Sequence, residues 1–212
     1  MRLAPLLVLA LLVVACGGGE RITETRDVAP FDRLVVEDSV DVAVVPGDSR
    51  EVRVYAGEKV IDRVHTDSVG GVLRVDVRDR GIVIGEDPLG DARVEVSAGT
   101  LRGVTVEGSS DVNLSDLDAD ALQLDVADAA DVDATGSVDR LTATIQGAGD
   151  ANLADLAVRS AVVVAKDAAD ADLNVSDSLD VTVNGAADVT YRGDPEVQSD
   201  VQDAGDLRRE TP

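Results

Sequence analysis

The chain has 212 residues and a formal net charge of −23, from 42 acidic residues, 19 basic residues and a single histidine. Such an acidic surface repels nucleic acid and bare anionic lipid, which excludes both as direct partners. One histidine, His65, is too few for a site with several histidine ligands. It lies in an irregular stretch and is interpreted as an exposed loop residue rather than a catalyst.

Residues 1–15 have the features of a signal peptide. Arg2 supplies the positive start, an apolar run follows, and small residues precede Cys16. The run is too short to span a bilayer comfortably. The segment resembles the lipobox of bacterial lipoproteins, which implies cleavage before Cys16 and attachment of lipid to that cysteine. The alternative is an ordinary secretory signal whose cleavage site happens to precede a cysteine.

Residues 16–27 are expected to form the lipidated cysteine and a flexible tether. Cys16 is the only cysteine, so an internal disulfide is impossible and lipidation gives the thiol a role. Glycines at 17–19 favour a flexible tether. We therefore expect an exported protein whose lipid anchor attaches it to the membrane of the bacterial cell envelope, at the outer membrane or cell surface. The number of membranes in that envelope stays open.

Residues 28–100 predict N-terminal strands and an irregular cap. Apolar residues alternate around Asp41 in residues 31–44, which predicts a first copy of the repeat described below. Further alternating runs at 52–55, 72–77, 82–84 and 94–96 predict longer strands in the first turns of a stack. Residues 57–69 predict an excursion with a short helix that covers the open end.

Residues 101–209 contain one short motif written six times. The copies read GSSDVNL, DAADVDA, GAGDANL, DAADADL, GAADVTY and DAGDLRR. A repeat of about 18–20 residues over six copies is typical of a solenoid. The shared aspartates, with the one in residues 31–44, are Asp41, Asp111, Asp131, Asp150, Asp170, Asp188 and Asp206.

Each copy predicts two strands and one tight corner. Leu122, Leu124 and Val126 alternate before Asp131, and Val132 begins the alternation after it. This period indicates strands with one buried face, and the small residues between them favour a tight bend. One copy cannot bury its own face, so copies must stack. We predict an all-β, single-stranded, right-handed β-helix over residues 28–209, with about 18–20 residues per turn.

The order of segments in this chain resembles a known family. FDRLVVEDSVDVAVVPGD is followed by VRVYAGEKVIDRV, GGVLRVDV and repeated GxxDV corners. This order is similar to the head domain, or GIN domain, of proteins described as auto-transporter adhesins, over residues 28–208. The resemblance implies a bacterial envelope protein, frequently a lipoprotein, with a β-helix-like fold and no catalytic residues.

The shared aspartates are interpreted as structural corner residues. Stacked copies would place their carboxylates ~4.8 Å apart, where each pair repels by about 1 kcal/mol in water. We expect each Asp to accept hydrogen bonds from its own corner, as in an Asx turn, and a calcium ion between corners is the alternative. Three residues earlier, glycine and aspartate alternate, which relieves repulsion or leaves spare metal ligands: Gly108, Asp128, Gly147, Asp167, Gly185 and Asp203.

The acidic residues do not favour an enzyme. They are spread evenly, whereas a glycosidase needs paired carboxylates in a cleft, and the chain has only three aromatic residues to hold a sugar. We assign no catalytic residue, cofactor or metal ligand. The sequence favours a non-enzymatic adhesion or surface-binding module whose partner is an envelope protein or glycan. Alternatives are a structural or stress-signalling accessory of the envelope and, less favoured, a polysaccharide-acting β-helix enzyme.

Overall fold

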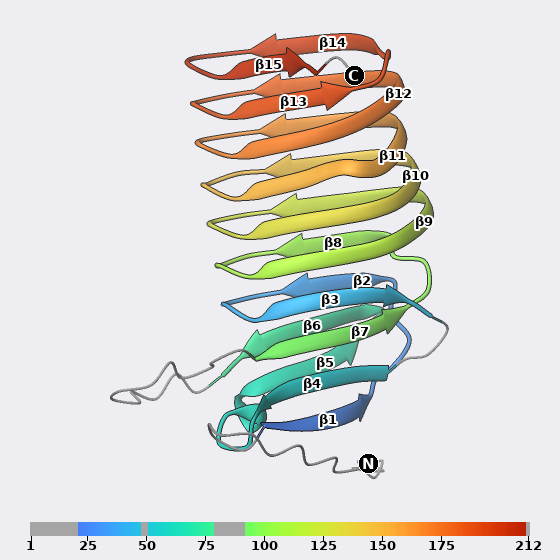
Figure 1. Ribbon diagram of the computed structural model, residues 1–212, viewed down its shortest axis with the longest axis vertical. Helices are drawn as coiled ribbons and strands as arrows, with labels where there is room; N and C mark the ends of the chain where they lie inside the picture. Colours follow the sequence, from blue (N-terminus) through green and yellow to red (C-terminus); the bar gives the residue numbers. More distant parts are fainter. Residues whose placement is uncertain (1–20, 48–50, 79–91, 211–212) are drawn as a thin grey trace.

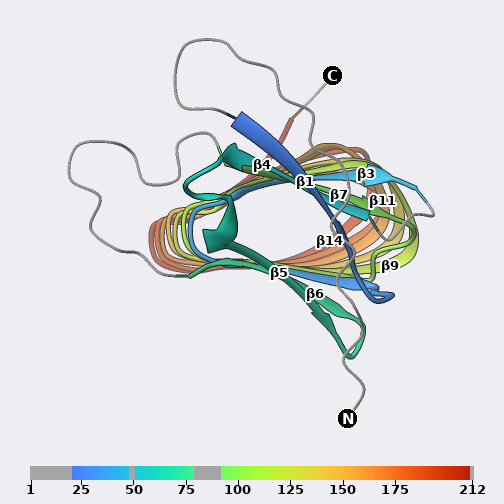
Figure 2. The same ribbon diagram turned by 90° about the horizontal axis from the view of Figure 1, so that it is seen from below.

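The computed structural model describes residues 21–47, 51–78 and 92–210. Most of them lie in strands, which wind into a right-handed β-solenoid with β1 near one end of the stack and β15 near the other (Figure 1). Seen along the axis, the turns superpose as two facing walls around one core (Figure 2). The prediction of an all-β solenoid is confirmed. No helix in the described ranges is long and apolar enough to cross a membrane.

The elements follow one another in a simple order. The N-terminal strands are β1 (Arg21–Asp27), β2 (Arg33–Val36), β3 (Asp41–Pro46), β4 (Glu51–Gly57), β5 (Val64–Val69), β6 (Val72–Val77) and β7 (Arg93–Ala98). The regular turns contain β8 (Gly103–Val106), β9 (Asp111–Val126), β10 (Asp131–Ile145), β11 (Asp150–Ala165), β12 (Asp170–Val183), β13 (Asp188–Arg192), β14 (Glu196–Val201) and β15 (Asp206–Arg209).

Strands β9 to β12 each make one complete turn of the solenoid. Each strand runs along one wall, bends, and returns along the other, pairing in parallel with the turns before and after it. Alternate residues point inward, so Val126, Ile145 and Val183 are at most 1% exposed and belong to the same core. The predicted alternation therefore becomes a shared apolar spine, whose burial is the main force that holds the turns together.

The second corner of each turn differs from the prediction of two separate strands. The strand continues through it, and the backbone takes a positive φ at Asp116 (51°) and Gly136 (116°). A Cβ added to Gly136 would lie 2.2 Å from the carbonyl oxygen of Leu117. The strand can therefore bend here without a loop because a glycine permits close contact with the turn below.

The N-terminal copy around Asp41 does not stack on its neighbours in sequence. β2 and β3 pair with β8 and β9, as in Arg33 with Gly103 and Val42 with Val112. β6 and β7 pair with the opposite edges of β2 and β3. The runs at 52–55, 72–77 and 94–96 form β4, β6 and β7 and lie in the first turns of the stack, as expected. The chain returns below β2 and β3 because only the copy at Asp111 continues their corner.

The lower end of the stack is closed by antiparallel strands. β1 pairs with β4, and β5 pairs with β6. The predicted short helix in residues 57–69 is only a three-residue 3-10 turn, Ile61–Arg63, followed by β5. Ile61 and Val64 are buried against the core, so this segment covers its end. The expected strand at 82–84, the signal peptide at 1–15 and Cys16 lie outside the described residues.

Candidate binding surface at the solenoid corners

The tight corners stack into one continuous column, which we call the corner ladder. It consists of the seven shared aspartates and the three residues before each of them. The strand register places Asp111 beside Asp131, Asp170 beside Asp150, and Asp188 between Asp170 and Asp206. All seven side chains are exposed except that of Asp206, which is half-buried. The structure thus gathers every predicted corner residue along one edge of the molecule.

At the lower end of the column of shared aspartates, the next side chain in the stack is positively charged. Asp41 lies beside Asp111 in the stack, but its partner on the other side is Arg93 of β7. Arg93 is exposed, as the aspartates are. Sequence reasoning missed this position because Arg93 belongs to no copy of the motif. The acidic column therefore has a defined end, with a positive charge between it and the cap.

Two of the shared aspartates, Asp41 and Asp131, are not held as the Asx-turn prediction expected. Asp41 Oδ1 accepts a hydrogen bond from the amide of Asp111 at 3.3 Å, and Asp131 Oδ1 accepts one from the amide of Asp150 at 3.1 Å. These carboxylates therefore bind the next turn rather than their own corner. The amide of Asp131 instead donates to the carbonyl oxygen of Ser110 at 3.0 Å. Hydrogen bonds between turns thus offset part of the repulsion in the column.

Two of the shared aspartates remain electrostatically unfavourable. Desolvation raises the pKa of Asp111 above its usual value, and the charges of Asp41 and Asp131 raise it further. Desolvation also raises the pKa of Asp150, followed by the charges of Asp131 and Asp170. The hydrogen bonds from Asp41 and Asp131 reach the backbone amides of Asp111 and Asp150, not their carboxylates. Negative charge at these positions therefore opposes folding.

The alternating position of the motif has a steric cause. The residue three before each shared aspartate has a positive φ in every corner, from 61° at Asp203 to 99° at Gly108. A Cβ added to Gly108 would lie 2.0 Å from the carbonyl oxygen of Asp38 in the turn below. A Cβ added to Gly147 would lie 2.3 Å from that of Asp128. Glycine is therefore required wherever the corner closes onto an aspartate below it.

The aspartates at this position hold the glycines beneath them. Asp128 Oδ2 accepts a hydrogen bond from the amide of Gly108 at 3.2 Å, and Asp167 Oδ2 accepts one from the amide of Gly147 at 3.3 Å. Each aspartate thus satisfies an amide that the corner leaves open. This arrangement accounts for the alternation of glycine and aspartate without a metal ion. A calcium ion between the corners stays an untested alternative.

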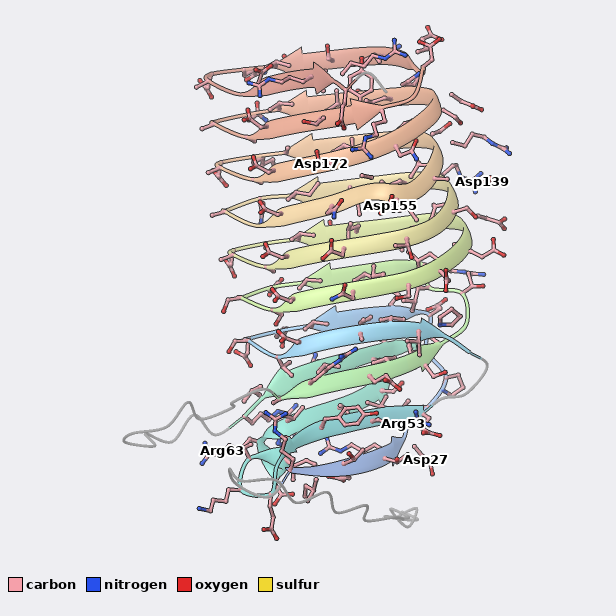
Figure 3. All side chains as sticks on the ribbon, in the orientation of Figure 1. Asp27, Arg53, Arg63, Asp139, Asp155 and Asp172 are labelled. Carbon is pink, nitrogen blue, oxygen red and sulfur yellow. The ribbon has the colours of Figure 1, made fainter. Side chains whose placement is uncertain are left out.

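A second polar column runs beside the corner ladder, two residues after four of the shared aspartates. It contains Asn113, Asp133, Asn152 and Asp172, which are stacked in register and exposed. Asn152 Nδ2 donates to Asp133 Oδ1 at 2.8 Å. Figure 3 shows Asp172 on this wall of the solenoid. The alternation of asparagine and aspartate could have been recognised in the sequence, and it separates like charges.

The described residues do not form a metal centre or an irregular catalytic cluster. No group of three or more His, Cys, Asp or Glu side chains within the described ranges is placed to hold a metal ion. A shallow, open depression lies over the lower corners, where Glu37, Asp38, Glu107 and Asp128 line it with Ser39, Gly108 and Ser109. Its carboxylates belong to successive turns of the ladder. The depression is thus part of the ladder rather than a separate cleft.

His65 does not occupy the exposed loop that the sequence suggested. It lies on β5, is half-buried, and is paired across the sheet with Asp76 of β6. Asp76 is buried, and its Oδ2 forms an ion pair with Arg78 Nη2 at 3.0 Å. The error arose because β5, within residues 57–69, was interpreted as part of an irregular cap. His65 therefore has a structural setting in the lower wall of the solenoid.

This geometry defines a β-solenoid that presents an exposed, periodic polar edge. A family model described as "Putative auto-transporter adhesin, head GIN domain" matches residues 30–195, and the chain belongs to this family. The resemblance seen in the sequence is thereby confirmed. Among curated proteins, none matches the chain.

Solved structures share the fold at low sequence identity. A structure titled as a putative adhesin from Bacteroides fragilis is 16% identical, with a TM-score of 0.73, over 90% of this chain and 97% of that one. A putative adhesin from Parabacteroides distasonis is 17% identical, with a TM-score of 0.58, over 92% and 98%. A putative lipid binding protein from the same species is 15% identical, with a TM-score of 0.54, over 92% and 98%.

Proposed function

We propose that this protein is a lipid-anchored, non-enzymatic adhesion or surface-binding module of the bacterial cell envelope, and that the corner ladder is its binding surface. The observation that carries the proposal is the exposed, periodic column of aspartates, which the fold repeats from Asp41 to Asp206. Membership in a family described as adhesins supports it. The even spacing suits a repetitive partner better than a single small substrate.

The proposed anchor would restrain the lower end of the solenoid near the membrane. Cys16 precedes Arg21, the first residue of β1, by five residues, and these span at most about 18 Å when extended. β1 lies at the lower end of the stack, and β15 lies at the far end of the same wall (Figure 1). Ten strands in that wall, spaced ~4.8 Å apart, extend about 40 Å. A lipid at Cys16 would thus keep the lower end of the stack near the membrane and leave the rest of the ladder free to extend away from it.

The proposed mechanism of binding is avidity. Each turn offers one shared aspartate and one side chain of the second polar column, and each exposed contact contributes little by itself. A partner with basic or hydroxyl groups at a similar spacing, such as an envelope protein or glycan, could contact several turns at once. Simultaneous contacts raise the overall affinity far above that of one contact. Binding should therefore depend on the number of intact turns.

The test is to neutralise the ladder in steps. Asp170→Asn, then Asp131→Asn with Asp170→Asn, and then four corner aspartates together should weaken binding to isolated cell envelopes progressively, by about twofold to fivefold per residue, as expected for exposed charge contacts. Binding is measured with the purified full-length chain on immobilised envelopes. Asp180→Asn is the matched control. Asp180 is exposed on the opposite wall, and its substitution removes the same charge away from the ladder.

Three outcomes would contradict the proposal. Complete loss of binding from one substitution would indicate a single site instead of avidity. Unchanged binding after neutralisation of four corners would favour the alternative of a structural or stress-signalling accessory. Hydrolase or lyase activity of the wild-type chain on a panel of acidic polysaccharides would contradict its non-enzymatic character.

A further inference from the structure

The C-terminal turn leaves the upper edges of both walls without a partner among the described residues. β14 pairs only with β12, and β15 pairs only with β13. The inward-facing side chains of this turn are incompletely covered: Val201 is 43% exposed, and Val197 and Leu207 are half-buried. The apolar core therefore reaches the surface at this end. An open sheet edge of this kind is a template for pairing with another strand.

The two edge strands lie on opposite sides of the core and meet at one tight corner. Val201 ends β14 and stacks on Val183, whereas Leu207 lies in β15 and stacks on Val189. Both therefore point inward at about the same distance from the corner. Asp200 and Arg208, each beside one of them, point outward on opposite walls.

A two-fold axis parallel to these strands would join two molecules end to end. The rotation exchanges the walls, so β14 of one copy lies over β15 of the second copy, and the two strands run antiparallel. Val201 then meets Leu207 of the second copy and extends the core across the interface. Asp200 meets Arg208 of the second copy on the outer surface. The symmetry makes each of these pairs twice.

The charges of the two strands match this arrangement. β14 carries the acids Glu196 and Asp200, whereas β15 carries Arg208 and Arg209 besides one acid, Asp206, at its start. Pairing β14 with β14 would place acids against acids, but pairing β14 with β15 of the second copy opposes unlike charges. We propose that the C-terminal turn is an end-to-end docking surface for a second copy of this chain, with β14 and β15 pairing antiparallel across a two-fold axis.

The contacts that these side chains make within one molecule are exchangeable. Arg208 binds the Asp206 carboxylate through Nε at 2.9 Å and Nη2 at 2.6 Å, and Gln202 Nε2 donates to Asp200 at 3.0 Å. Asp200 and Arg208 are exposed, so solvent screens both contacts. Charge repulsion between two molecules of net charge −23 opposes association. Local strand pairing and burial of the open core must therefore provide the affinity.

The first test is a disulfide cross-link in the full-length chain, produced in the envelope of a bacterial host. Asp200→Cys together with Arg208→Cys should give a dimer on a non-reducing gel, because residue 200 of each copy lies beside residue 208 of the other. The two cysteines cannot pair within one chain, since they face outward from opposite walls. The matched control is Thr182→Cys with Thr190→Cys, which occupy the same two walls one turn lower and stack on residues 200 and 208. A dimer yield no higher than that of the control would overturn the proposal.

The second test separates specific pairing from cross-linking by chance. Asp200→Arg and Arg208→Asp, each alone in the full-length chain extracted in mild detergent, should weaken dimerisation about tenfold in sedimentation equilibrium, because each charge pair occurs twice and changes to repulsion. The double variant restores opposite charges and should recover to within about threefold of wild type. Dimers that survive both single substitutions, or no rescue in the double variant, would contradict this pairing. These outcomes do not depend on binding by the corner ladder.

Discussion

Asp150 shows how single residues in the corner ladder balance structure against charge. Its amide is held by Asp131 Oδ1, but the structure gives its carboxylate two acidic neighbours, Asp131 and Asp170. Burial and these charges raise its pKa, so folding favours the protonated form. The backbone of this corner is stabilised while its side chain is not. Retention of an unfavourable charge in an exposed row is consistent with the proposed role of the row in binding.

Asp150→Asn should therefore stabilise the protein at neutral pH. The expected gain in the free energy of unfolding is about 0.2–1 kcal/mol, the range for an exposed charge interaction. The raised pKa means that the wild-type side chain is least unfavourable below its unfolded pKa and becomes destabilising as pH rises through the folded pKa. The advantage of the variant should thus decrease on acidification toward pH 4. Urea unfolding of the wild type and the variant at pH 7 and at pH 4 measures the gain and its decrease with acidification. A variant that is less stable than the wild type at pH 7 would be evidence against repulsion between the aspartates of the column.

At the scale of elements, β11 shows why the strands were predictable from sequence. Val163 is fully buried and Val162 is 49% exposed, because adjacent residues of a strand point to opposite faces of the sheet, one toward the core and one toward solvent. The run AVVVA at 161–165 shows no alternation by itself, and the period of two is taken from the matching positions of other copies, such as Leu122, Leu124 and Val126. The hydrogen bonds of Asp128 and Asp167 to the turn below were not predictable, since they depend on the handedness and stacking distance of the corners. The sequence showed the alternation of glycine and aspartate there, but not its cause.

Two adjacent valines provide a matched test of this face assignment. Val163→Ala should lower the free energy of unfolding by about 2 kcal/mol, because it removes buried methyl groups and leaves a cavity. Val162→Ala makes the same chemical change on the outer surface and should cost less than about 0.5 kcal/mol. Chemical denaturation of the two variants compares them directly. Equal losses would mean that β11 does not have one buried and one exposed face.

At the scale of the whole molecule, the stacking of copies was predictable but their spatial order was not. The repeated motif of residues 101–209 contains the information for parallel pairing in register, because every copy has the same corner at the same interval. The copy at Asp41 joins the same stack beside Asp111, although 70 residues separate them. The segment between them forms the lower turns and the antiparallel cap. No residue pattern marks this return, because antiparallel and parallel strands with one buried face share the same alternation.

The stability of the whole solenoid should respond to salt rather than to a particular ion. We expect its melting temperature to rise with ionic strength, because the formal charge of −23 is screened. Calcium and a chelator at matched ionic strength should give the same midpoint if no ion is bound between the corners. A specific increase with calcium would instead indicate binding to the folded state and revive the calcium alternative. Scanning calorimetry with magnesium as the ionic control would distinguish these outcomes.

The most direct measurement is an intrachain disulfide between the first copy and the regular turns. Asp41 and Asp111 begin neighbouring parallel strands, and a spacing of ~4.8 Å lies within the Cα range that a disulfide accepts. Asp41→Cys with Asp111→Cys should therefore oxidise within one chain, as detected by mass spectrometry of the linked peptides. Asp41→Cys with Asp131→Cys is one turn too far and should remain reduced. Failure of the first pair to link, or equal linking of both pairs, would contradict the stacked solenoid on which the ladder and its function depend.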